Sequence, residues 1–248
     1  MRPLIGTCAA AALAAVATGD PAAIGCAAVS MIGSLGLGVA FPALGVFGPV
    51  LSRSGAAADG TLALTFDDGP NARFTPRVID ALGRLGHRAT FFLVGESVAR
   101  HPDVARAIRD AGHGIGLHSN VHSPWNALYG RDRLRADFQA AERTFEDALG
   151  LRPSLYRPPV GLVNPRVMAV ARERGYRVVA WTVRALDGVR FWTPGTVRAR
   201  VRAAAAGDVV LMHDALHGRP DEVPPGVLAL PGILADLGAR GLRSVTIA

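Results

Sequence analysis

Acidic and histidine side chains stand at the ends of several short apolar runs in this 248-residue chain. Asp67 and Asp68 follow the run Leu62–Phe66, while His118 and His213 close two further runs. If these runs are parallel strands, their carboxyl ends meet at one edge of a sheet and bring the polar side chains together. The pattern therefore predicts one site of chemistry rather than scattered surface groups.

His118 and His122 are four residues apart, so one helical turn or a compact loop would bring both imidazoles to one face. A carboxylate from Asp67 or Asp68 would complete a His-His-Asp set that leaves coordination positions open for water and substrate. Adjacent aspartates leave the backbone in different directions, so one can bind a metal while the other acts as a base. The histidine pair alone fits a structural role equally well, but the strand-end acids and His213 favour a metal site.

Apolar runs alternate with helical patterns from Thr61 onward. We expect strands at Leu62–Phe66, Ala89–Val94, Gly114–His118, Val178–Val183, Val209–His213 and Arg243–Ile247. We expect helices at Thr75–Leu85, Pro102–Ala111, Arg131–Leu149, Pro165–Arg174, Thr196–Ala206 and Val227–Ala239. Such alternation implies an α/β fold with a parallel sheet, either doubly wound or closed as a barrel.

The composition excludes several classes of protein. Half of the residues are hydrophobic and 19% are charged, which excludes a disordered chain. The net charge of +7 comes entirely from arginines that are scattered along the chain, so we expect no nucleic acid partner. The two cysteines, Cys8 and Cys26, lie in the apolar N-terminal stretch, which argues against a disulfide framework.

Two uncharged apolar runs, Pro3–Gly19 and Pro21–Phe41, occupy the N-terminus and are separated by Asp20. Each run is long enough to cross a bilayer, so residues 1–41 are predicted to form a helical membrane hairpin or anchor. A cleaved signal peptide, with a cleavage site near Ala15–Ala17, is the alternative for the first run.

The few charges around the two runs favour a cytoplasmic location for the rest of the chain. Arg2 precedes the first run and Arg53 follows the second, while the turn between them carries only Asp20. Residues 42–60 are rich in Pro, Gly, Ser and Ala and are interpreted as a linker, which leaves residues 61–248 as the catalytic domain.

The chemistry-bearing segments also resemble a known family. Their sequences are similar to motifs of the polysaccharide deacetylases with a NodB homology domain, which form carbohydrate esterase family 4. The matching segments are Thr65–Pro70, Ala89–Phe92, His118–His122, Arg157–Gly161 and Leu211–Asp214. The resemblance covers Thr61 to Ile247. It implies a distorted (β/α) barrel and a metal-dependent hydrolase that removes an N-acyl group, usually acetyl, from an amino sugar.

Carried over by position, the resemblance assigns Asp67 as the general base and His213 as the general acid. It makes Asp68, His118 and His122 the ligands of a divalent metal ion. Zinc suits two imidazoles and a carboxylate, and cobalt, nickel or manganese can occupy the same set.

Three further roles follow from the same resemblance. Arg157 would orient the base, Asp187 would form a charge pair that tunes the acid, and the backbone N–H of Val160 would help to bind the oxyanion.

Three positions depart from the family's motifs. Arg184 replaces an acid and Gly188 an aromatic residue in the fourth motif, while Val160 replaces an aromatic residue in the third. The loss of aromatic side chains from the wall predicts a more open or differently shaped pocket, in which Arg184 meets an anionic group such as a phosphate.

The sequence leaves three functions to compare. The first is a membrane-anchored, metal-dependent deacetylase whose substrate is an N-acylated sugar or glycan. The second is a deformylase or deacylase of a lipid-linked sugar at the membrane. The third is a membrane-tethered carbohydrate-binding protein without turnover, which is disfavoured because Asp67, His118, His122 and His213 are all present.

Overall fold

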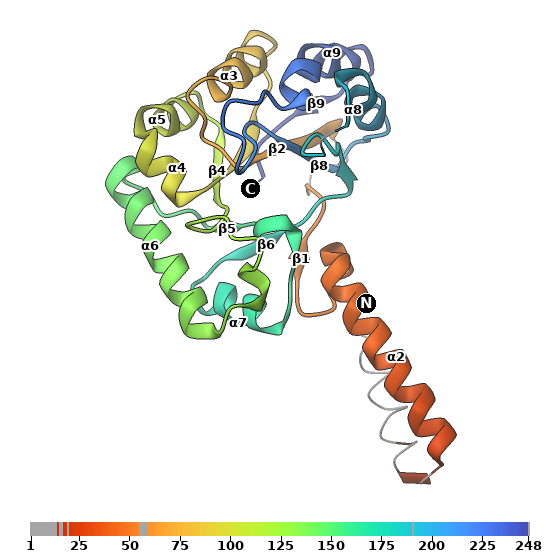
Figure 1. Cartoon of the computed structure of the whole chain (residues 1–248). Coiled ribbons are helices and arrows are strands. Elements are labelled where there is room, and N and C mark those ends of the chain that lie inside the picture. Colours follow the sequence, from red (N-terminus) through yellow and green to blue (C-terminus); the bar gives the residue numbers. More distant parts are fainter. Residues whose placement is uncertain (1–13, 15–16, 19, 55–58, 190, 248) are drawn as a thin grey trace.

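A curled parallel sheet surrounded by helices forms most of the molecule, and one long helix projects from it (Figure 1). The computed structural model describes residue 14 and residues 17–18, 20–54, 59–189 and 191–247. The strands are β1 (Val50–Leu51), β2 (Thr61–Asp67), β3 (Ala89–Leu93), β4 (Gly114–Leu117), β5 (Leu155–Tyr156), β6 (Arg177–Val179), β7 (Val183–Arg184), β8 (Val209–His213) and β9 (Arg243–Ser244).

The sheet has the order β1-β6-β5-β4-β3-β2-β8-β7, and β9 also pairs with β2. Every pair of these strands is parallel, and the sheet path ends at β1 on one side and β7 on the other. The described strands therefore form an incompletely closed barrel. The expected α/β fold with a distorted (β/α) barrel is confirmed.

Helices connect successive strands and lie around the outside of the sheet (Figure 1). They are α3 (Thr75–Arg84), α4 (Gly95–Arg100), α5 (Pro102–Asp110), α6 (Arg131–Leu149), α7 (Pro165–Glu173), α8 (Pro194–Val201) and α9 (Pro225–Ala239). Proline stands in the first turn of α3, α5, α7, α8 and α9, where its missing N–H has no helical partner to lose.

Alternate side chains of the central strand β2 lie on opposite faces of the sheet, one face toward the main apolar core and the other toward the residues expected to do chemistry. Leu62, Leu64 and Phe66 belong to the main apolar core, whereas Ala63 belongs to a smaller cluster with Phe92 of β3. Thr65 and Asp67 alternate with the core residues, so they share the face of Ala63. All seven residues of β2 are buried, as expected for a central parallel strand covered on both faces.

The run Val178–Val183, expected to be one strand, is divided between two parts of the sheet. β6 pairs with β1 and β5, whereas β7 pairs with β8. Between them the Ala180 N–H donates to the Leu51 carbonyl and the Thr182 N–H donates to the Val209 carbonyl. The run therefore crosses the opening of the barrel, and its apolar composition does not distinguish that path from one continuous strand.

The segment interpreted as a linker also contributes to the sheet. Val50 and Leu51 form β1 and pair with Val178 and Val179 of β6. The expected last strand Arg243–Ile247 is shorter, since β9 contains only its first two residues.

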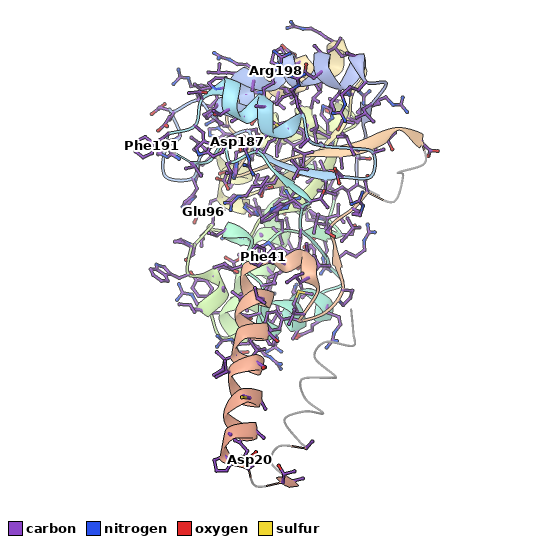
Figure 2. All side chains as sticks on the ribbon, turned by 90° about the vertical axis from the view of Figure 1, so that its right-hand side faces the viewer. Asp20, Phe41, Glu96, Asp187, Phe191 and Arg198 are labelled. Atoms are coloured by element: carbon purple, nitrogen blue, oxygen red, sulfur yellow. The ribbon has the colours of Figure 1, made fainter. Side chains whose placement is uncertain are left out.

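α2 (Pro21–Ala40) is the projecting helix, with Asp20 at its far end and Phe41 where it meets the barrel (Figure 2). Its segment Pro21–Val39 is 19 residues long with a mean hydropathy of 1.9, and it is almost entirely exposed. By length and composition it can cross a membrane. Most of the first expected span, Pro3–Gly19, lies outside the described residues.

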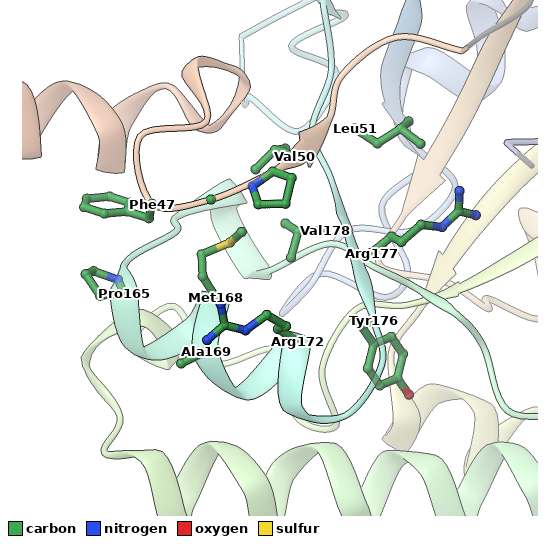
Figure 3. Close-up of a pocket in the computed structure, with 12 residues that line it drawn as sticks. Phe47, Val50, Leu51, Pro165, Met168, Ala169, Arg172, Tyr176, Arg177 and Val178 are labelled. Atoms are coloured by element: carbon green, nitrogen blue, oxygen red, sulfur yellow. The ribbon is translucent and has the colours of Figure 1, made fainter. Parts of the chain in front are cut away.

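A cavity of about 420 Å³ lies where the chain passes from α2 into the barrel (Figure 3). Apolar residues such as Phe47, Val50, Met168 and Val178 line it, and it contains none of the residues expected to do chemistry. The segment after α2 is thus packed against α7 and β6.

This packing predicts that residues 42–60 stabilise the barrel. A chain beginning at Pro42 should unfold at a higher urea concentration than one beginning at Thr61, because the shorter chain loses β1 and exposes the apolar edge of β6. We expect a difference on the order of 2 kcal/mol for the apolar area exposed, measured by far-UV circular dichroism. Equal unfolding midpoints would instead show that residues 42–60 act as a linker.

Candidate active site and metal centre

The loops that follow β2, β4, β5, β7 and β8 enclose a cavity of about 280 Å³, called here the strand-end cavity. Its lining includes Asp67, Asp68, His118, His122, Val160, Arg184 and His213. The register of β2 and β8 pairs Asp67 directly with His213, so an acid and a histidine stand side by side at the carboxyl ends of adjacent strands. The predicted convergence of polar residues is therefore present.

Asp67 is fixed by a guanidinium that is wholly enclosed in protein. Arg157 is 0% exposed, and its Nη1 donates to Asp67 Oδ1 at 2.7 Å and to Thr65 Oγ1 at 2.8 Å. The same group lies 4.1 Å from the ring centroid of Phe92 and donates from Nη2 to the Ala180 carbonyl at 3.2 Å. Burial lowers the pKa of Arg157, and the Asp67 carboxylate counteracts that effect. Asp67 Oδ1 is thus held by Arg157, while Asp67 Oδ2 lies 3.8 Å from His118 Nε2.

Asp68, His118 and His122 bring their potential ligand atoms within 4.8 Å of one another. Asp68 Oδ1 lies 3.4 Å from His118 Nε2 and 3.0 Å from His122 Nε2. The Nδ1 of His118 is 2.6 Å from the Arg157 carbonyl oxygen, which makes Nδ1 the donor and leaves Nε2 free to bind a cation. The backbone N–H of His217 donates to Asp68 Oδ2 at 3.1 Å and holds the carboxylate from its other side.

These residues fit a divalent metal ion. Asp68 Oδ1 is buried and accepts no hydrogen bond that meets ordinary geometry, although two imidazole nitrogens stand beside it. Burial on its own would raise the pKa of Asp68, but the contacts with His118 and His122 lower it well below its usual value. Two neutral imidazoles and one carboxylate are a donor set suited to zinc and neighbouring transition metals.

His213 is held by both oxygens of Asp187. The carboxylate accepts from the His213 backbone N–H at 2.8 Å and from Nδ1 at 2.8 Å. Burial alone would lower the pKa of His213, but the charge of Asp187 and its hydrogen bond raise it to about 9. The imidazole therefore stays protonated at neutral pH with Nε2 available as a donor.

Asp187 is in turn enclosed by the start of α9. A Cβ added at Gly226, in the first turn of that helix, would overlap Asp187 Oδ2. Asp187 is only 1% exposed, so its carboxylate is almost entirely enclosed by protein. The absence of a side chain at Gly226 allows this close approach.

Val160 lies on the cavity wall in a short helical turn after β5, with φ 58° and a largely exposed side chain. The next residue, Gly161, has φ 73°, and a Cβ there would overlap the ring of Trp181. Loop and ring thus fit together only with glycine at 161.

All described non-glycine residues with positive φ belong to loops of this site. They are Asp68, Ser119, His122, Val160 and Leu186, with φ between 48° and 74°. Such backbone is unfavourable for residues with a Cβ and persists where surrounding contacts impose it. The site is therefore built on loops that packing holds in place.

His217 is not among the site residues that the sequence predicts, but its ring centroid lies 4.4 Å from that of His122 in the strand-end cavity. Asp214, left out of the predicted site, is fully buried, and its Oδ2 accepts from the Thr75 hydroxyl. Burial raises the pKa of Asp214 to about 7. The position of Asp214 directly after His213 was a usable signal, whereas the sequence gives no sign that the chain at His217 folds back.

Comparison with known proteins adds to this geometry. The family model for polysaccharide deacetylase matches residues 54–179, which include Asp67, Asp68, His118, His122 and Arg157. A peptidoglycan-N-acetylglucosamine deacetylase from Bacillus cereus is 36% identical over 190 residues, which cover 75% of this chain and 85% of the relative. The chain belongs to the polysaccharide deacetylase family. It is a hydrolase that acts on carbon–nitrogen bonds other than peptide bonds.

Solved structures agree with this assignment. A family 4 carbohydrate esterase from Streptomyces lividans in complex with acetate has a TM-score of 0.69 and 31% identity, covering 77% of this polysaccharide deacetylase and 94% of that chain. A CE4 family pseudoenzyme from Bacillus anthracis has a TM-score of 0.71 and 26% identity, covering 80% and 67%. The fold is thus shared with proteins described as active and as inactive.

The His213–Asp187 pair predicts a specific change in pH dependence. In Asp187→Asn the carboxylate that raises the pKa of His213 is lost, so that pKa should fall. A general acid works only when protonated, and its activity is lost as the pH rises through its pKa. The alkaline limb of the kcat/KM profile should therefore move to lower pH, with a rate loss on the order of 10²-fold at neutral pH.

The matching control is Asp236→Asn, because Asp236 is a half-buried acid of α9 that is ion-paired with Arg198 and lies outside the cavity lining. It should leave the alkaline limb where it is in the parent enzyme. If Asp187→Asn also left that limb in place, His213 would not be the group that titrates there.

Proposed function

We propose that this polysaccharide deacetylase removes the N-acetyl group from an amino sugar of a glycan and that a divalent metal ion is required. One observation carries the proposal: Asp67 and His213 stand side by side on adjacent strands, and the Asp68–His118–His122 set lines the same cavity. A base, an acid and a cation site on one wall are what amide hydrolysis needs.

In this proposal Asp67 accepts a proton from the attacking water. Its carboxylate is held by Arg157, so it is oriented before the substrate arrives. His213 donates its Nε2 proton to the leaving nitrogen as the carbon–nitrogen bond breaks, and Asp187 stabilises the protonated ring until then. Acetate and a free amine on the sugar are the products.

Asp68, His118 and His122 would hold the metal ion. A bound divalent cation supplies Lewis acidity to the amide carbonyl. The backbone N–H of Val160 would stabilise negative charge on the carbonyl oxygen, which explains why a valine can stand there. Zinc, cobalt, nickel and manganese are all compatible with these donors.

A carbohydrate-binding protein without turnover is the competing function, and the pseudoenzyme relative shows why it must be tested. Against it, each group that amide hydrolysis needs is present and connected: Asp67 to Arg157, His213 to Asp187, and the three ligands to one another. A binding protein has no need of a histidine kept protonated beside a buried carboxylate.

Acetate release from N-acetylglucosamine oligomers by the full chain tests the proposal. We expect release in the presence of zinc or cobalt, loss with a chelator and recovery when metal is restored. Asp67→Asn should reduce the rate by at least about 10²-fold without loss of bound metal, because Asp67 is proposed as base and not as ligand. Bound metal without release of acetate or formate from any substrate would favour the binding protein.

We further propose that α2 anchors the enzyme in a membrane. Its support is the exposed apolar surface of Pro21–Val39 and the absence of charge between Asp20 and Arg53. An anchored enzyme could reach either a polymeric glycan or a lipid-linked sugar, depending on the side it faces, and the flanking arginines favour the cytoplasmic side.

Cell fractionation checks the anchor. The enzyme should remain with membranes after washes with high salt and alkaline carbonate and should be released only by detergent. The N-terminal sequence of the mature protein should begin before Pro21. Recovery in the soluble fraction with a new N-terminus near Ala17 would instead identify a cleaved signal peptide.

A further inference from the structure

Arg184 occupies a defined position in the wall of the strand-end cavity. It ends β7 and pairs in register with Leu211 of β8, two residues before His213. Arg184, Leu211 and His213 all line the cavity. The Arg184 guanidinium lies 5.8 Å from the ring centroid of Trp181, which forms part of the same wall. Strand pairing therefore places Arg184 in the same cavity wall as the proposed acid.

Unlike Arg157 and Arg219, Arg184 has no carboxylate partner among the residues that the structure describes. Arg157 is paired with Asp67, and Arg219 donates to Glu222 at 2.9 Å and to the Gly188 carbonyl at 3.0 Å. Within the part of the chain that the structure describes, no carboxylate reaches salt-bridge distance of Arg184. A guanidinium in the cavity wall is thus left without a counterion.

The acids of the cavity are committed to other partners. Asp67 holds Arg157, Asp68 lies between two imidazoles, and Asp187 holds His213. None of them can neutralise Arg184 without abandoning a contact on which the proposed reaction depends. A divalent cation at Asp68 would make the cavity more positive still.

Solutes can reach the guanidinium, because Arg184 is exposed and lines the strand-end cavity. Gly188 lies in the same wall, and a Cβ there would stand only 3.2 Å from His213 Cε1, so the absence of a side chain leaves the His213 ring uncovered on that side. Guanidinium groups bind carboxylates and phosphates through two parallel hydrogen bonds.

We propose that Arg184 forms an anion subsite that selects amino-sugar substrates carrying a carboxylate or phosphate close to the N-acetyl group. The subsite rests on the proposed deacetylase function and narrows its substrate to acidic glycans. A carboxylate on an ether-linked acid and a phosphate ester both offer two oxygens to a guanidinium. The structure therefore assigns a negative charge to the substrate group, and experiment decides whether a carboxylate or a phosphate carries it.

The test compares acidic with neutral substrates at low salt. kcat and KM are measured for a neutral N-acetylglucosamine oligomer, for a peptidoglycan fragment with free lactyl carboxylates and for an oligomer bearing a phosphate. For each acidic substrate, the selectivity ratio is its kcat/KM divided by that of the neutral oligomer. In Arg184→Ala, this ratio should fall about tenfold for the acidic substrate that the parent enzyme prefers, mainly because KM for that substrate rises. In the parent enzyme the same ratio should fall as salt is added.

Arg143→Ala is the matched control, because Arg143 is an exposed arginine of α6 outside the cavity. It should leave kcat/KM for all three substrates unchanged. An unchanged acidic-to-neutral ratio in Arg184→Ala would overturn the subsite. In the parent enzyme, the acidic substrate with the larger acidic-to-neutral ratio of kcat/KM, carboxylate or phosphate, identifies the source of the charge.

A binding measurement separates failure of the subsite from failure of the proposed function. The full chain is freed of metal with a chelator and kept in detergent. Isothermal titration calorimetry then measures its affinity for N-acetylmuramic acid, N-acetylglucosamine 6-phosphate and neutral N-acetylglucosamine. The acidic sugar should bind more tightly than the neutral one to the parent protein and lose that advantage in Arg184→Ala. Loss of the advantage without any acetate release would reject the deacetylase and keep the subsite, whereas equal affinities in the parent protein would reject the subsite alone.

Discussion

Arg157 is the residue on which the geometry of the site depends. Its side chain holds Asp67, while its carbonyl oxygen accepts from the Nδ1 of His118. One residue thus fixes the proposed base at the end of β2 relative to one proposed metal ligand directly after β4. Burying a guanidinium costs several kcal/mol, which its ion pair, its carbonyl partners and the face of Phe92 offset only while all of them stay in place. The inner face of the barrel is therefore as much an electrostatic assembly as a hydrophobic one.

Around that fixed centre, regular strands and irregular loops divide the work. Strand pairing sets Asp67 opposite His213 and Arg184 opposite Leu211, so relative heights along the barrel follow from register. The loops then turn the side chains inward, and they do so through residues with positive φ. These unfavourable conformations occur at two of the proposed metal ligands and at the proposed oxyanion donor. The rigid barrel beneath the loops prevents their backbone from relaxing.

The sequence predicted the strands and helices that have a clear period, and it predicted most of the site, because apolar runs ending in Asp67 or His213 carry both signals together. It could not predict β1 and β5, since two residues are too few to show a pattern. The run Val178–Val183 was misinterpreted because a crossing between sheet edges and a continuous strand are equally apolar. The position of His217 beside His122, and the lack of a partner for Arg184, depend on how distant loops fold and leave no trace in local sequence.

The close contact between α9 and Asp187 has a consequence for how such an enzyme can diverge. The proton affinity of His213 is set by a carboxylate whose position is limited by the backbone of Gly226, a residue outside the strand-end cavity. A one-carbon change on a surface helix could therefore shift the acidity at which the enzyme works without altering any group that the substrate touches. In this barrel, adaptation to a new environment and adaptation to a new glycan can proceed through separate residues.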